Sequence, residues 1–214
     1  SGSTDDTVAI AKSFGARVIE TDWPGYREQK NRAAQWAKND WILGLDADEA
    51  VDDTLAAEIK TALVSPNVEG FEIGRLGFWM GRPIEHGTWR PDRSIRLYDR
   101  RKGRWLGGAV HERVQVDGKI RRLSGDILHR PYRDLDEQLR DLNRYAELFV
   151  QDALMNGRKA YAFDVIFRPM AHVVKAIIIR FGFLDGVRGW MLAGVGAMGV
   201  MMKWGMLYLN QRRQ

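Results

Sequence analysis

Three carboxylates lie together in the segment LGLDADEA, which covers residues 43–50. The apolar run WILGL, which is typical of a buried strand, comes directly before Asp46, Asp48 and Glu49. Side chains two apart in a strand point the same way, so Asp46 and Asp48 are expected to face one pocket. Two such carboxylates favour a shared Mg²⁺ or Mn²⁺, which could bridge a diphosphate. The alternative is that the acids only cap the next helix.

A second candidate site is the pair His111-Glu112 within GGAVHERV. A carboxylate whose pKa is raised by apolar walls can act as a general base toward a hydroxyl group. The plainer interpretation is an exposed strand in which Glu112 forms an ion pair with Arg113 or Arg121. Residue types alone favour this plainer interpretation.

The elements that would position these residues alternate between helix and strand in the first 64 residues. The central strand is 41–48, expected in a parallel sheet, and Asp52 and Asp53 cap the helix that follows it. Asp46 and Asp48 would then lie at the carboxyl end of that strand, where open α/β sheets bind ligands. The other expected elements are a helix over 4–14, a strand over 16–23, a turn at 24–25 and a helix over 26–38. The helix capped by Asp52 and Asp53 is expected to end at Val64.

Residues 70–130 have a different pattern, with short alternating runs interrupted by Gly and Pro, as in antiparallel strands and loops. An amphipathic helix is expected over 134–156, packed back on the core. Two apolar helices are expected over 171–183 and 187–209, rich in Met, Gly and Trp.

Composition narrows the function classes. The chain of 214 residues is long enough for one domain with an appendage, and it has no cysteine, so a disulfide framework and a thiolate metal site are excluded. The net charge of +5 arises entirely from residues 164–214, because the preceding part is neutral. A basic, apolar tail favours an anionic membrane surface over a nucleic acid.

The longest charge-free run of the tail, 189–202, is shorter than the roughly 20 residues that cross a bilayer. An interfacial pair of helices is therefore expected, with Trp190, Trp204 and Tyr208 near the headgroups. The alternatives are helices that pack on the domain or form a dimer.

Three motifs in order resemble the family-2 glycosyltransferases with the GT-A fold, a Rossmann-like α/β domain. They are SGSTDDT at the start, QKNRAAQWAKNDWILGLDADE, and GGAVHERV. GFLDGVRG (182–189) and the basic, apolar C-terminus are similar to bacterial lipopolysaccharide-core glucosyltransferases. The resemblance implies a GT-A domain over 1–130 and a helical, membrane-associating extension over 131–214, apolar and basic over 163–210. The family's opening strand and first nucleotide-binding loop do not precede SGSTDDT, so the sequence is expected to be N-terminally incomplete.

The resemblance also implies roles for individual residues. Ser1 and Ser3 would lie near the ribose of the donor and Lys30 near the donor itself, although Ser3 or Thr4 would equally suit a helix N-cap and Lys30 a solvated surface. Asp48, assisted by Asp46, would hold the metal. Glu112 would act as the base, with His111 orienting it. His129 could complete the metal shell, as a later His does in some relatives, or be a hydrogen-bonded structural histidine.

On the acceptor side, the aromatic face of Trp89 could stack on a sugar ring, although Trp79, Trp89 and Trp105 would each suit an ordinary core. Arg93 and Arg96 could contact phosphates in bidentate fashion or form surface salt bridges.

The expected reaction is an inverting transfer of glucose from UDP-glucose. The acceptor implied by the resemblance is the inner core of lipopolysaccharide, or a similar lipid-linked saccharide, at the cytoplasmic face of the bacterial inner membrane. The alternatives are a glycosyltransferase acting on polyprenyl phosphate or an exopolysaccharide, and a catalytically inactive membrane-interaction module.

Overall fold

The computed structural model describes residues 2–107 and 112–211. The chain divides into two compact units, each of which combines segments that are distant in sequence. The first consists of Ser1–Gly44, Val64–Glu72 and Ser94–Arg122, and the second of Leu45–Leu63, Ile73–Arg93 and Leu123–Gln214. The boundary expected near residue 130 stays a prediction.

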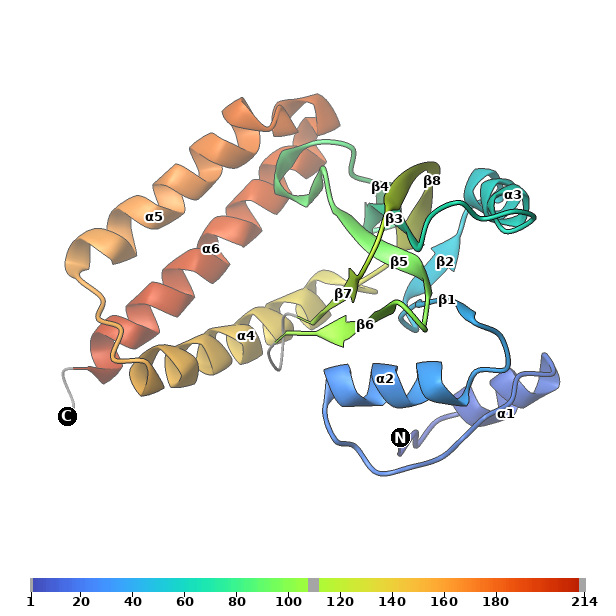
Figure 1. Ribbon diagram of the computed structural model, residues 1–214. Coiled ribbons are helices and arrows are strands. Elements are labelled where there is room, and N and C mark those ends of the chain that lie inside the picture. Colours follow the sequence, from blue (N-terminus) through green and yellow to red (C-terminus); the bar gives the residue numbers. More distant parts are fainter. Residues whose placement is uncertain (1, 108–111, 212–214) are drawn as a thin grey trace. The chain divides into compact units, whose positions relative to one another are not determined.

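The main sheet has the strand order β1-β5-β3-β8-β2, with β4 paired to β3 (Figure 1). A separate two-stranded ribbon joins β6 and β7, with Gly103 opposite Val116. The long strands β3 and β8 contribute residues to both units. The strands are β1 (Trp41–Leu43), β2 (Glu49–Val51), β3 (Gly70–Trp79), β4 (Arg82–Pro83), β5 (Arg93–Asp99), β6 (Gly103–Leu106), β7 (Arg113–Val116) and β8 (Ile120–His129).

The first unit contains the helices α1 (Thr7–Ser13) and α2 (Tyr26–Trp36). The end of α2 is closed by Arg100, whose guanidinium donates to the carbonyl groups of Ala34, Gln35 and Ala37. A cation at this position satisfies carbonyl groups that the helix leaves unpaired and favours the helix dipole. The core of the unit is built on Tyr98, Trp105 and Val114.

Two expectations for the first unit were wrong. Residues 16–23 form no strand. Strand β1 ends at Leu43, lies at the end of the strand order and pairs antiparallel with β5, so it is not a central parallel strand. Beyond β1, Gly44 lies against Trp105, where a Cβ atom would be 2.9 Å from the indole ring, and residues 47–48 form a turn. The loop carrying Asp46 and Asp48 is therefore positioned by a turn, not by strand alternation.

The second unit holds α3 (Asp53–Ala62), whose N-cap confirms the prediction: the Asp52 carboxylate accepts from Leu55 N at 2.6 Å. Helix α3 packs closely on β8, because a Cβ atom at Gly125 would lie 2.3 Å from Leu55 N. Strand β2, which the sequence pattern did not predict, pairs antiparallel with β8, with Glu49 opposite His129. This pairing brings the end of β8 next to the turn that carries Asp48.

The C-terminal part of the second unit is helical. It comprises α4 (Leu135–Met155), α5 (Ala162–Val174), the π-helical turn η2 (Lys175–Ile179), the 3₁₀ turn η3 (Gly182–Asp185) and α6 (Gly186–Asn210). Helix α5 lies alongside α6, and the C-terminal half of α4 packs on α6 through Val150, Ala153 and Leu207 (Figure 1). Helix α5 begins at Ala162, earlier than predicted, because the Asp164 carboxylate accepts from Tyr161 N at 2.9 Å and caps the helix.

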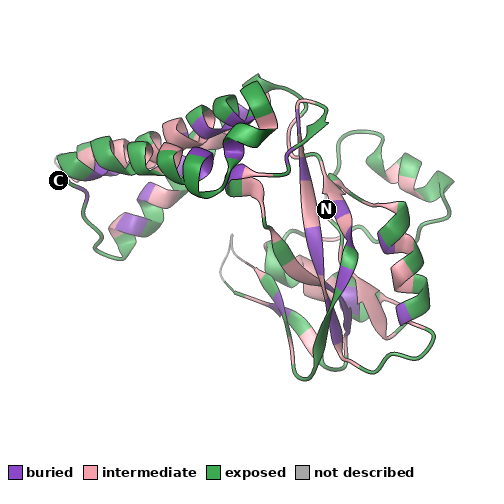
Figure 2. Ribbon diagram, turned by 90° about the horizontal axis from the view of Figure 1, so that it is seen from above, coloured by how far each residue is buried: buried purple, intermediate pink, exposed green. Residues whose placement is uncertain are grey.

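The long C-terminal helix is apolar. The segment Gly182–Asn210 is long and apolar enough to cross a membrane by length and composition, and about 28% of its most apolar stretch is buried. Many large apolar side chains on α5 and α6 are exposed (Figure 2). Membrane association stays a prediction at this point.

Candidate active site

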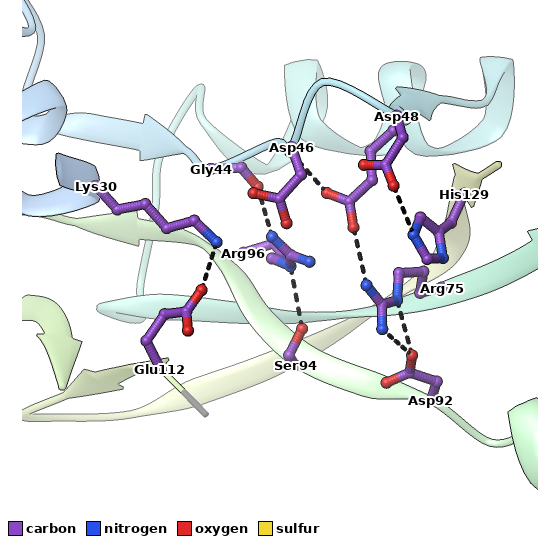
Figure 3. Close-up of polar contacts among 11 residues, drawn as sticks. Lys30, Gly44, Asp46, Asp48, Arg75, Asp92, Ser94, Arg96, Glu112 and His129 are labelled. Carbon is purple, nitrogen blue, oxygen red and sulfur yellow. Dashed lines mark hydrogen bonds and ion pairs between the residues drawn. The ribbon is translucent and has the colours of Figure 1, made fainter. Parts of the chain in front are cut away.

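Asp48 and His129 contact each other, with the Nε2 atom of His129 3.0 Å from Oδ2 of Asp48 (Figure 3). The β2–β8 pairing places them there, and Arg130 N donates to the carbonyl oxygen of Asp48 at 2.9 Å. The hydrogen bond from His129 outweighs burial and holds the pKa of Asp48 below its usual value. The two residues that the sequence proposed as metal ligands from separate motifs thus meet in the structure.

Next to this pair, a buried carboxylate organises the loop. The Glu49 side chain is fully buried, accepts from Asp46 N at 2.9 Å, and forms an ion pair with Arg75 at 3.2 Å (Figure 3). Arg75 in turn lies 2.6 Å from Asp92. Burial opposes the charge on Arg75, but Asp92 and Glu49 outweigh it and raise its pKa.

Sequence reasoning missed Arg75 and Asp92, because each lies in a run without a distinctive pattern. Glu49 was noted only as a third acid beside Asp46 and Asp48. Its full burial was the property that spacing alone did not reveal.

A cavity of about 340 Å³ opens beside these groups, a size near the lower end of small-molecule sites. Its polar wall includes Arg75, Asp92 and His129, and its aromatic wall includes Trp89 and Tyr132, with ring centroids 6.5 Å apart. Trp89 can lie close to β3 because position 77 is glycine: a Cβ atom there would be 2.5 Å from the indole. Burial raises the pKa of Tyr132 to about 12. Aromatic faces beside hydrogen-bonding groups suit a sugar ring.

Glu112, in the first unit, pairs with Lys30, whose Nζ lies 2.9 Å from Oε1 (Figure 3). Lys30 also lies over the ring of Trp105, 4.5 Å from its centroid. Asn31 holds Trp105 through both its amide oxygen and its amide nitrogen. The ion pair that Glu112 forms within the described residues is therefore with Lys30 and not with Arg113 or Arg121, the partners of the alternative interpretation, and its role as a base stays a prediction.

Comparison with known proteins decides the family. Residues 1–122 match the model of glycosyl transferase family 2. The chain belongs to this family. The glycosyltransferase is 31% identical over 200 residues to an uncharacterized glycosyltransferase of Rickettsia typhi, covering 88% of this chain and 68% of the relative. It is 28% identical to the lipopolysaccharide core biosynthesis glycosyltransferase LpsC of Rhizobium meliloti, covering 92% and 76%. The mixed α/β sheet with its long apolar C-terminal helix confirms the predicted GT-A fold class.

In the second unit, the side chains that could hold a metal are the carboxylate of Asp48 and the imidazole of His129, which are in contact with each other. Within residues 2–107 and 112–211, no group of three His, Asp or Glu side chains is arranged to hold an ion. Mg²⁺ in nucleotide sites is commonly bound through one or two carboxylates and completes its shell with phosphate and water. The Asp48 carboxylate fits that arrangement, with His129 next to it.

Several other predicted residues of the glycosyltransferase are structural or lie outside the described residues. Arg96 is buried and donates to Ser94 Oγ at 3.2 Å and to the carbonyl group of Gly44 at 3.4 Å, so it braces the loop after β1. Trp79 and Trp105 are buried core residues. Ser1 and His111 lie outside the described residues.

Ser3 is exposed and does not cap a helix, because α1 begins at Thr7 and Asp5 accepts from Thr7 N. The proposed contact of Ser3 with a ribose stays a prediction.

Proposed function

We propose that this glycosyltransferase moves glucose from UDP-glucose to the inner core of lipopolysaccharide, or to a similar lipid-linked saccharide, with inversion at the anomeric carbon. The observation that carries the proposal is the Asp48–His129 contact beside a cavity with an aromatic wall. A relative named for lipopolysaccharide core biosynthesis, matching over 92% of this chain, supports the acceptor class. The basic C-terminus and the exposed apolar side chains of α5 and α6 support a site of action at the cytoplasmic face of the bacterial inner membrane.

Asp48 and His129 would hold Mg²⁺ or Mn²⁺, and Asp46 would assist from the same turn. Such a cation would neutralise the charge that develops on the diphosphate leaving group. Glu49 fixes the turn by accepting from Asp46 N, and Arg75 keeps the buried Glu49 carboxylate paired. The chain therefore supplies a preorganised loop for the diphosphate end of the donor.

Glu112 would act as the general base in a single displacement. The acceptor hydroxyl gives its proton to Glu112 while its oxygen forms the bond to the anomeric carbon. The bond from that carbon to the diphosphate oxygen breaks on the opposite face, so the configuration inverts. Lys30, which lies over the Trp105 ring, forms an ion pair with the Glu112 side chain, which is 13% exposed.

The cavity lined by Trp89, Asp92 and Tyr132 would take a ring of the acceptor saccharide. One face of the sugar can stack on the indole, while carboxylate and guanidinium groups bond its hydroxyls. The metal ligand His129 also lines this cavity, so acceptor and donor groups share a wall.

Purified full chain with UDP-glucose and MnCl₂ tests the proposal against a panel of acceptors: a heptose-containing inner core, polyprenyl phosphate, and an exopolysaccharide fragment. We expect glucose on the core heptose, with the anomeric configuration opposite to that of the donor by proton NMR. Turnover on polyprenyl phosphate alone would show that the lipopolysaccharide inner core is not the acceptor. Retention of configuration would exclude the single displacement. Failure to bind UDP with Mn²⁺ would favour the inactive membrane-interaction module.

A further inference from the structure

A second cavity, of about 360 Å³, lies in the second unit where the loop after β4 meets the turn between η2 and η3. Three arginines line it, Arg90, Arg93 and Arg180, against the single carboxylate of Glu85. Asp126 already balances Arg90 through two hydrogen bonds of 3.0 and 2.9 Å. In the described parts of the chain, Arg93 and Arg180 have no ion-pair partner. The cavity thus carries two uncompensated guanidinium groups.

The GFLDGVRG segment directly follows Arg180 and Phe181 of this cavity and contacts the loop after β4. Asp185 accepts from Glu85 N at 3.2 Å and from His86 N at 2.9 Å, and it also contacts His86 Nδ1. Gly87 N donates to the carbonyl oxygen of Arg180 at 2.8 Å. These contacts fix the backbone of Arg180 against the loop after β4.

Two glycines of the same segment allow this close approach. A Cβ atom at Gly182 would lie 2.6 Å from the carbonyl oxygen of Ala176, and one at Gly189 would lie 1.8 Å from that of Gly182. Only glycine fits positions where one backbone packs directly on another. The motif therefore packs closely on η2 and on the loop at Gly87.

Large apolar side chains surround the cationic cavity and are exposed. Ile179 and Phe181, which line it, are 63% and 56% exposed. Ile178, Leu184 and Val187 nearby in sequence are exposed as well. Exposed apolar side chains beside unpaired arginines are unfavourable in water but suit a surface that offers both acyl chains and phosphates.

We propose that this cavity binds the phosphate of an anionic phospholipid headgroup. Arg93 and Arg180 supply planar donors that match phosphate oxygens, while Ile179 and Phe181 enter the acyl region beside it. The inference deepens the membrane association in the proposed function and rests on it. It gives the GFLDGVRG segment a purpose, which is to hold Arg180 next to Arg93 at the membrane surface.

Vesicle sedimentation tests the site without donor or acceptor. Full chain is mixed with vesicles of phosphatidylcholine alone or with added phosphatidylglycerol, and R93Q and R180Q are compared with R188Q. The control removes the same charge from the first turn of α6, outside the cavity. We expect binding to require phosphatidylglycerol and to weaken roughly fivefold for each cavity variant, with a much smaller change for R188Q.

Equal losses in all three variants would mean diffuse attraction and would overturn the site, as would binding that does not depend on phosphatidylglycerol. Soluble glycerol phosphate that binds Arg93 and Arg180 as tightly as the vesicles do would overturn the lipid assignment. I179S separates the apolar contribution, and we expect it to weaken binding while its thermal unfolding stays near that of the wild type. Loss of transferase activity with intact vesicle binding would count against the proposed function alone.

Discussion

The Nε2 atom of His129 lies 3.0 Å from Oδ2 of Asp48, although 81 residues separate them in sequence. The pairing of β2 with β8 creates this contact, since Glu49 is opposite His129 and Asp48 precedes Glu49. The hydrogen bond lowers the pKa of Asp48, so the carboxylate is ionised at neutral pH and able to bind a cation. One sheet register therefore assembles both proposed metal ligands.

The Asp48→Asn substitution is expected to weaken UDP binding in the presence of Mn²⁺ by at least about tenfold, because it removes a charged ligand while keeping the side-chain shape. Calorimetry measures the dissociation constant. EDTA should bring the wild type to the level of the variant. Asp53→Asn, an exposed residue in the first turn of α3, is the matched control and should bind like the wild type. If D48N and the wild type bound UDP equally tightly with Mn²⁺, Asp48 would not be a metal ligand.

Asp92→Asn is expected to raise KM for the acceptor roughly tenfold, the loss of one hydrogen bond to a charged group, with the affinity for UDP unchanged. Asp92 lines the cavity and lies 2.6 Å from Arg75. Steady-state kinetics at saturating UDP-glucose separates the two effects. Asp117→Asn, in the exposed turn after β7, serves as the control. A change in UDP affinity without a change in KM for the acceptor would mean that the cavity binds the donor.

Gly125→Ala is expected to destabilise the fold by about 1–3 kcal/mol, since the new methyl group would overlap the backbone of α3 at Leu55. Gly194→Ala in α6 is the matched control, because open space surrounds that position and alanine is the better helix former. Thermal unfolding should therefore fall for G125A and rise slightly for G194A. An unchanged midpoint for G125A would mean that α3 does not pack on β8 so closely.

His172 predicts a pH-dependent loss of stability. Burial lowers its pKa below the usual 6.5, with Lys175 a smaller cause, and its buried Nε2 has no hydrogen-bond partner among the described residues. The unfolded chain therefore binds a proton near pH 6.5 that the folded chain does not. The contribution of His172 to the free energy of unfolding is therefore fully present above that pH and is lost as the pH falls below it.

His172→Phe should reduce this dependence. The measurement is the unfolding midpoint at about pH 8 and about pH 5.5, where an ordinary histidine changes its charge. We expect the wild type to lose more stability between the two than the variant does. Identical pH profiles would mean that His172 takes up its proton as readily in the folded protein.

Local signals predicted two helices of the second unit well. The Asp52 cap located α3 and the amphipathic pattern located α4 to within two residues, because a helix depends on contacts between near neighbours. The predicted GT-A fold class is confirmed, since it followed from three motifs in a fixed order.

Pairings between distant segments were not predictable. The position after an apolar strand suggested Asp48 and the family resemblance suggested His129, but only the β2–β8 register brings them together. The contact of Lys30 with Glu112 joins residues 82 apart, and nothing in either motif indicates it. Arg75 and Asp92 acquire their place from β3 and the loop before β5, so a sequence pattern of period two could not distinguish them from surface charges.

The Glu112→Gln substitution tests the central claim most directly, with transfer to the core acceptor and UDP binding measured on the same preparation. The amide keeps the shape of the side chain but cannot take a proton, so we expect transfer to fall by about 10²–10⁴-fold with UDP affinity nearly unchanged. Equal loss of transfer and of UDP binding would contradict the account, because Glu112 would then support the structure and not the reaction.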